Sequence, residues 1–152
     1  MSEAPTWDRI ASRYDLAARV FGRSYPAVRR ALSRDLAGHQ RALELASGTG
    51  QFTSAIAQAV ESVVATDVSI EMVERLRAEV LAQGVENVSV RRMSAYEIDA
   101  DDQSFDAVVC ANALHVMERP RDALGEVRRV VSAEGVIVAP TFLHGAGAAT
   151  RL

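Results

Sequence analysis

Short continuous runs of apolar residues alternate along this chain with stretches in which apolar positions recur every three or four residues. The short runs predict strands at residues 41–46, 62–66, 88–90, 105–110 and 135–139. The helical spacing predicts helices at residues 6–20, 24–36, 53–60, 70–83 and from Pro120 up to Gly135. Strands that alternate with amphipathic helices favour βαβ units, and therefore an α/β fold in which helices cover both faces of a parallel sheet of about five strands.

Polar residues and glycines mark where the last two of these helices begin and end. Ser69 is a good N-cap for helix 70–83, and Gly84 provides its C-terminal stop. The expected apolar face of this helix is Met72, Val73, Leu76, Val80 and Leu81. In the last helix we expect Leu124, Val127, Val130 and Val131 to face the core and Gly135 to end the helix.

The stretch ALELASGTGQF, residues 42–52, runs from a buried strand through a Gly-rich turn into a helix. Glycines in such a turn allow a positive φ and a close approach of backbone N–H groups to a ligand. Asp67 ends the second strand, at the edge of the sheet where the first strand also ends. A carboxylate at this place can accept hydrogen bonds from both ribose hydroxyls of a nucleoside. Alternatively, Asp67 acts as a helix N-cap, a role that needs no ligand.

A nicotinamide dehydrogenase is one candidate for such a nucleotide site. Its G-x-G-x-x-G motif would place the third glycine at Thr53, and a Tyr-x-x-x-Lys pair for hydride transfer needs a lysine. All 17 basic residues of the chain are arginines. An NAD(P)-dependent oxidoreductase is therefore the weaker alternative.

ALELASGTGQF, VVATDVS, FDAVVCANALHVM and EGVIVAP follow one another in the order and spacing of class I S-adenosylmethionine-dependent methyltransferases. WDRIASRYD near the start resembles the (F/W)D-x-x-A-x-x-YD opening of the branch that includes ubiquinone/menaquinone-biosynthesis and phospholipid N-methyltransferases. The resemblance covers residues 7–142. It implies a Rossmann-like fold, S-adenosyl-L-methionine as the cofactor, S-adenosyl-L-homocysteine as the product, and a small-molecule or lipid-like methyl acceptor.

The resemblance also implies roles for individual residues. The methionine end of the cofactor would contact Glu44, Ala46, Ser47, Gly48, Thr49 and Gly50, with Tyr14 closing over it. Asp67 would hold the ribose hydroxyls, Val68 and Met72 would pack near the adenine, and Ser94 and Ala95 would lie at its edge. The floor below the sulfonium would be Ala111, Asn112 and Leu114.

The chain departs from the family pattern at three places. Ala46 stands where the family has its first loop glycine, which is tolerable if φ stays negative there. Ser94 stands where the family usually has an acid at the adenine amine, so we expect a modest cofactor affinity. The chain stops after the fifth expected strand, where the family's sheet continues with two more. We therefore expect a C-terminally truncated domain, which is either part of a longer enzyme or a module that binds the cofactor without turnover.

Methyl transfer requires alignment of donor and acceptor more than covalent chemistry, and a general base only where the acceptor must lose a proton early. His115 is the one histidine placed for that role, although a wall residue packed under the cofactor is the preferred interpretation. Cys110 is expected to be a small buried hydrophobe. A single cysteine cannot form a cysteine-rich zinc site, and no metal is expected.

Composition adds expectations about organisation and surroundings. The 152 residues fit one domain, with residues 1–41 as a helical cap, 42–142 as the core and 143–152 as a flexible tail. The sequence has no apolar run long enough to cross a bilayer, no secretory signal at its start and a single cysteine, which together predict a cytoplasmic protein.

The net charge of −3 is distributed unevenly, since residues 1–41 carry eight arginines against four acidic residues. Such a basic segment would suit an acidic substrate or peripheral contact with a membrane surface, although the solvated face of amphipathic helices is the preferred explanation. No nucleic-acid partner is expected. The fifth strand would be an apolar sheet edge, and such an edge invites pairing with another chain. We therefore expect a homo-oligomer that hides this edge.

Overall fold

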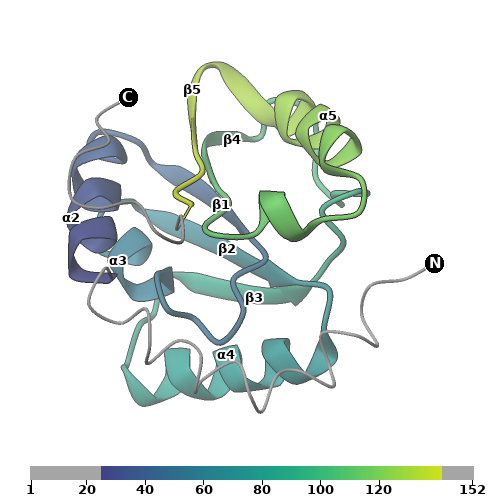
Figure 1. The fold of residues 1–152 in the computed structure, drawn as a ribbon. Coiled ribbons are helices and arrows are strands. Elements are labelled where there is room, and N and C mark those ends of the chain that lie inside the picture. Colours follow the sequence, from purple (N-terminus) through teal and green to yellow (C-terminus); the bar gives the residue numbers. More distant parts are fainter. Residues whose placement is uncertain (1–24, 142–152) are drawn as a thin grey trace, which may run out of the picture.

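The computed structural model describes residues 25–141, and Figure 1 shows their arrangement. In chain order the elements are α2 (Tyr25–Asp35), β1 (Arg41–Leu45), α3 (Thr53–Ala57), β2 (Ser62–Asp67), α4 (Ile70–Ala82), β3 (Val88–Arg92), β4 (Phe105–Val109), the 3-10 helix η1 (Leu114–Val116), α5 (Pro120–Val130) and β5 (Val131–Val138). The predicted helix 6–20 and the tail 143–152 lie outside the described residues.

The five strands form one parallel sheet in the order β3-β2-β1-β4-β5. Helices α2, α3 and α4 cover one face, where Leu32, Ile56 and Leu76 enter one buried cluster. Helix α5 covers the other face, where Val127 and Val130 pack against residues of β1 and β4. The predicted α/β architecture is therefore confirmed, and β1 lies at the point where the strand order reverses, the usual place for a ligand in such sheets.

The start of β1 is fastened to β4 by a side chain. The backbone N–H groups of Gln40 and Arg41 donate to the two carboxylate oxygens of Asp106, each at 2.7 Å. The three residue pairs that join β1 to β4 begin at Ala42 and Ala107, directly after this contact. Asp106 thus fixes the register of the two central strands at one end.

Helix α4 follows its sequence signals closely. The Ser69 hydroxyl accepts the N–H of Met72 at 3.2 Å, which makes Ser69 the N-cap as predicted, and Gly84 has φ +63° just past the end of the helix. The predicted inward position of Leu81 is wrong, because this side chain is 82% exposed. Leu81 lies one position past Val80, and one step along a helix turns a side chain by about 100° away from the core.

Two other predictions about helices need correction. Helix α3 ends at Ala57, three residues earlier than predicted, although Val60 is still buried. In α5 the predicted inward residue Leu124 is 43% exposed, because Ala123, Val127 and Val130 occupy the side of the helix that faces the sheet.

The junction of α5 and β5 also differs from the prediction. Helix α5 ends at Val130, β5 begins at Val131, and Gly135 lies inside the strand. A Cβ atom at Gly135 would lie 2.9 Å from the carbonyl oxygen of Asp106 and 2.7 Å from a methyl group of Val131. The glycine therefore allows a close approach of β5 to β4 at an irregularity of the pairing, and it does not end a helix.

Within residues 25–141, no helix combines the length and the apolar character needed to span a bilayer.

Candidate functional site

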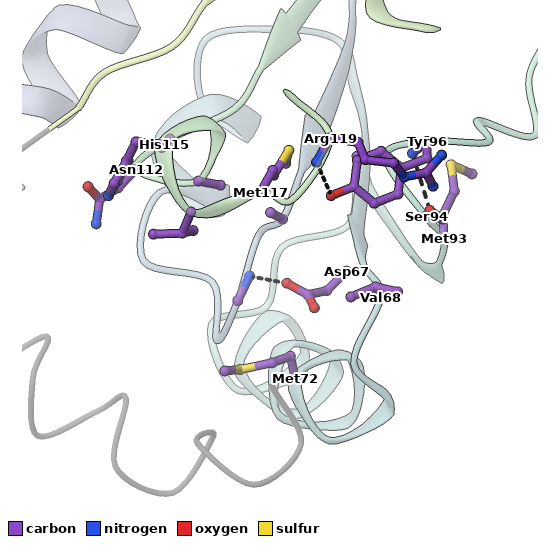
Figure 2. A pocket seen from close by; sticks show the side chains of 16 residues that line it. Asp67, Val68, Met72, Met93, Ser94, Tyr96, Asn112, His115, Met117 and Arg119 are labelled. Carbon is purple, nitrogen blue, oxygen red and sulfur yellow. Dashed lines mark hydrogen bonds between the residues drawn. The ribbon is translucent and has the colours of Figure 1, made fainter. Parts of the chain in front are cut away.

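A cavity of about 310 Å³ opens beside the carboxyl ends of the strands (Figure 2). Ten of the predicted site residues line it: Ala46, Gly48, Asp67, Val68, Met72, Ser94, Ala95, Ala111, Asn112 and His115. Five others do not line this cavity: Glu44, Ser47, Thr49, Gly50 and Leu114. Tyr14 lies outside the described residues.

Asp67 connects the Gly-rich loop to the start of α4. One carboxylate oxygen accepts the N–H of Gly48 and the other accepts the N–H of Ser69, both at 2.9 Å, and the residue is 7% exposed. Figure 2 shows the carboxylate between the loop and Val68, facing the cavity. Each carboxylate oxygen can accept more than one hydrogen bond, so Asp67 can hold the loop and still receive a ligand hydroxyl. Its N-cap role is only partial, because Ser69 caps the helix.

The loop turns through left-handed backbone conformations. Gly48 has φ +56° and Gly50 has φ +93°, as the glycines predict, but Ala46 also has a positive φ, +52°. The condition under which alanine would be tolerated without strain, a negative φ, is therefore not met at Ala46. At Gly50 an added Cβ would lie 2.7 Å from the Leu76 side chain, so this glycine allows the loop to pack closely on α4.

Replacing Ala46 by glycine should therefore stabilise the domain. A left-handed alanine is strained, and relief of that strain minus the entropy that glycine gains in the unfolded chain leaves about 0.5–1 kcal/mol. Urea unfolding of Ala46→Gly measures this. The matched control is Ala78→Gly on the exposed face of α4, where glycine should destabilise by about 1 kcal/mol. Equal destabilisation by both changes would contradict the strain at Ala46.

Glu44, which was expected to contact the methionine end of a cofactor, is buried behind the Gly-rich loop. It is 1% exposed and accepts a hydrogen bond of 2.6 Å from the Thr53 hydroxyl. Burial raises the pKa of this carboxyl to about 7. Glu44 lines a small second hollow, and Ala46 and Asn112 line both that hollow and the large cavity. The carboxyl group is therefore next to the large cavity without facing it.

Asn112 follows β4 and, like Ala46 after β1, adopts a positive φ, here +53°. Its N–H donates to the carbonyl oxygen of Pro140 at 2.7 Å, which holds the turn after β4 against the end of β5. Strands β1 and β4 are neighbours, so two left-handed residues other than glycine meet at the junction of the cavity and the hollow. Backbone strain of this kind concentrates at functional sites.

The wall of the cavity also includes residues that the sequence did not single out. They are Met93, Tyr96, Val116, Met117 and Arg119, whereas Ala113, which also lines the cavity, lies within the floor expected from Ala111 to Leu114. The Arg119 guanidinium stacks over the Tyr96 ring, 4.3 Å from its centroid, and Arg119 also pairs with Asp122 at 2.9 Å. Tyr96 and Arg119 belong to different loops, and no local sequence pattern indicates that they meet. In Figure 2 they lie at the opposite end of the cavity from Asn112 and His115.

Two residues with reactive side chains have different surroundings. His115 is exposed on η1 and lines the cavity. Cys110 is 2% exposed, and burial raises the pKa of its thiol to about 11. A thiol that is so buried and so weakly acidic behaves as a small hydrophobe, as expected.

Comparison with known proteins identifies the family of this chain. A family model described as a methyltransferase domain matches residues 43–139, which include most of β1, all of β2 to β5 and every residue that lines the cavity. This chain belongs to the class I S-adenosylmethionine-dependent methyltransferases.

Individual relatives of this chain are also named as methyltransferases. Demethylmenaquinone methyltransferase of Clavibacter sepedonicus is 33% identical over 139 residues, which are 90% of this chain and 56% of the relative. Phosphatidylethanolamine N-methyltransferase of Cereibacter sphaeroides is 35% identical over 99 residues, 64% of this chain and 48% of the relative. The crystal structure of the YcgJ protein from Bacillus subtilis superposes with a TM-score of 0.69 at 27% identity, covering 78% of this chain and 50% of that one. The chain thus spans about half the length of the relatives it matches.

Proposed function

We propose that this methyltransferase domain binds S-adenosyl-L-methionine in the cavity and directs methyl transfer to a small-molecule or lipid-like acceptor. The observation that carries the proposal is the meeting of the Gly-rich loop, the Asp67 carboxylate and an apolar wall in one cavity at the strand ends. Family membership supplies the class of reaction.

The residues present fit this cofactor. The volume of about 310 Å³ is at the lower end of the range of small-molecule sites, roughly 300–1,000 Å³. Val68, Met72 and Met93 offer apolar surface to a purine, and Asp67 offers acceptor positions to ribose hydroxyls. The polar methionine end would then extend past Ala46 and Asn112 toward the hollow that Glu44 lines.

The cofactor supplies an already activated methyl group on a positively charged sulfur. The protein has to orient the reacting atoms and exclude water. Asp67, anchored on two backbone N–H groups, would fix the ribose, and the turn after β4 at Ala111 and Asn112 would support the reacting end. His115, at the same end of the cavity, would form part of the wall and could accept a proton from an acidic acceptor.

An apolar acceptor is favoured by the edge of the cavity next to His115. Val116 is 46% exposed and lines the cavity together with Met117. The names of two relatives, a demethylmenaquinone and a phosphatidylethanolamine methyltransferase, support an acceptor with an apolar body.

Titration calorimetry of the full chain with S-adenosyl-L-methionine, S-adenosyl-L-homocysteine and NADH tests the cofactor. We expect both methionine nucleosides to bind and NADH not to bind. If NADH bound and neither methionine nucleoside did, the proposed cofactor would be wrong. Methyl transfer from a radiolabelled donor to a panel that includes demethylmenaquinone and phosphatidylethanolamine then tests turnover. Binding without transfer to any acceptor would favour a module that only binds the cofactor.

We also propose that β5 pairs with β5 of a second copy of the chain. Within residues 25–141, β5 hydrogen-bonds to β4 alone, and Ile137 on this strand is 47% exposed. An apolar, β-branched edge favours such pairing. Sedimentation velocity should show a dimer or larger species that Ile137→Lys shifts to the monomer. A wild-type protein that stays monomeric at high concentration would contradict the pairing.

A further inference from the structure

One wall of the cavity consists of a segment with no helix or strand of its own. Residues 93–104 join β3 to β4, and the first four of them, Met93 to Tyr96, line the cavity. The Ser94 hydroxyl accepts the N–H of Tyr96 at 3.2 Å, and the Ser94 carbonyl accepts the N–H of Glu97 at 3.3 Å. Residues 94–97 therefore form a tight turn, and the position of this turn depends on where the chain is held next, at Ile98.

Ile98 is held on both backbone groups by two charged residues of α5. Its N–H donates to Glu126 Oε2 and its carbonyl accepts from Arg129 Nη2, both at 2.8 Å. Arg129 binds the carboxylate of Glu126 in a bidentate manner, with Nε and Nη2 each 2.8 Å from an oxygen. The remaining nitrogen, Nη1, donates to the carbonyl of Ala100 at 2.8 Å. The two side chains thus replace the strand partner that this segment lacks.

The same helix also contacts the wall at its other end. Arg119 precedes the first residue of α5, and its guanidinium covers the ring of Tyr96. Between these contacts Ile98, 3% exposed, packs in one buried cluster with Val127 and Val130 of α5. The wall is therefore attached to α5 through stacking, burial and charge-assisted hydrogen bonds, which are stronger than hydrogen bonds between neutral groups.

We propose that Glu126 and Arg129 are a positioning pair that sets the wall formed by residues 93–96, and thereby the affinity for the nucleoside part of the ligand. The inference rests on the proposed function, because it assigns that wall to the adenosine end of S-adenosyl-L-methionine. Neither side chain lines the cavity, so the pair acts through Ile98 and the turn that precedes it.

Arg129→Met tests the pair, because methionine is unbranched and similar in reach but donates no hydrogen bond. S-adenosyl-L-homocysteine and adenosine should both bind ~10-fold more weakly, since both use the same wall. In a transfer assay KM for the methyl donor should rise by a similar factor while kcat stays within about twofold, because the reacting end of the cavity is untouched.

Asp102→Asn is the matched control. Asp102 accepts from the same Arg129 at 2.9 Å, but its side chain is 73% exposed and holds no wall residue. Ligand affinity should remain that of the wild type. Arg129→Lys keeps the charge without the planar fork, so its affinity should fall between those of Arg129→Met and the wild type.

Other outcomes would overturn the inference. Wild-type affinity in both Arg129 variants would do so, as would a fall in kcat at unchanged KM. If the wild-type protein bound no methionine nucleoside, the proposed function would fail, yet the pair could still be tested by amide hydrogen exchange. Exchange at residues 94–98 should become at least ~10-fold faster in Arg129→Met, and unchanged exchange would show that the pair does not hold the wall.

Discussion

Raising the pH from 4.5 to 7 should lower the free energy of unfolding by about 3 kcal/mol through Glu44 alone, since its pKa is raised from 4.5 to about 7 in the fold. Burial is the main cause, because it favours the protonated form. The stabilisation of the protonated carboxyl is complete below the pKa of the unfolded chain. This stabilisation is lost as the pH rises through the pKa of Glu44 in the folded state, because the folded state must then hold a buried charge.

Glu44→Gln isolates this effect from other carboxyl groups. Glutamine resembles the protonated acid, so the variant should match the wild type near pH 4.5 and exceed its stability by about 3 kcal/mol above pH 7. Urea unfolding at several pH values measures the difference. Glu74→Gln, on an exposed position of α4, is the control and should give a constant difference. A constant difference for Glu44→Gln as well would mean that the fold does not raise the pKa of Glu44.

Asp67→Ala should weaken both the domain and its ligand binding. The change leaves the N–H groups of Gly48 and Ser69 without their present acceptor, which costs about 1–3 kcal/mol for each group that stays unsatisfied. Binding of S-adenosyl-L-homocysteine should fall by a further 1–3 kcal/mol, roughly 5- to 150-fold, if the carboxylate pairs with the ribose hydroxyls. Thermal unfolding and calorimetry measure the two effects separately.

A pair of ligands separates the two roles of Asp67. Adenosine has both ribose hydroxyls and 2′,3′-dideoxyadenosine has neither. If Asp67 binds the hydroxyls directly, Asp67→Ala should weaken adenosine far more than the dideoxy analogue. An equal loss for both would mean that Asp67 acts on binding only through the position of the Gly-rich loop.

The sheet was predictable because its signals are local. Each of β1, β2 and β4 is a short apolar run ending at the same edge, and the predicted order of strands and helices between residues 25 and 141 is confirmed. The predicted end of the last helix was wrong because a glycine can either end a helix or allow two strands to approach closely. Gly135 resembles a helix stop in the sequence, but the structure uses its missing side chain for the approach of β5 to β4. The position of Asp106, distant in the sequence but adjacent to Gly135 in space, distinguishes the two.

The cavity was predictable on the side formed by strand ends and less so on the other. Asp67, Gly48 and Ala111 follow predicted strands, so the parallel sheet alone brings them together. Tyr96 and Arg119 are separated along the sequence, and they meet because α5 packs on the far face of the sheet. The positive φ at Ala46 was not predicted, because an alanine in a sequence does not indicate one. The turn requires a left-handed residue at this position even though alanine is strained there.

The link from Asp106 to the start of β1 has a consequence for the way the chain assembles. Its two hydrogen bonds span 66 and 65 residues, so the chain between them must close a long loop before they form. That loop contains α3, β2, α4 and β3. Contacts of such sequence separation slow folding, so the pairing of β1 with β4 depends on a slow, non-local step. The edge where the ligand cavity lies is complete only after that step, so a nascent chain cannot present the site before β4 has joined the sheet.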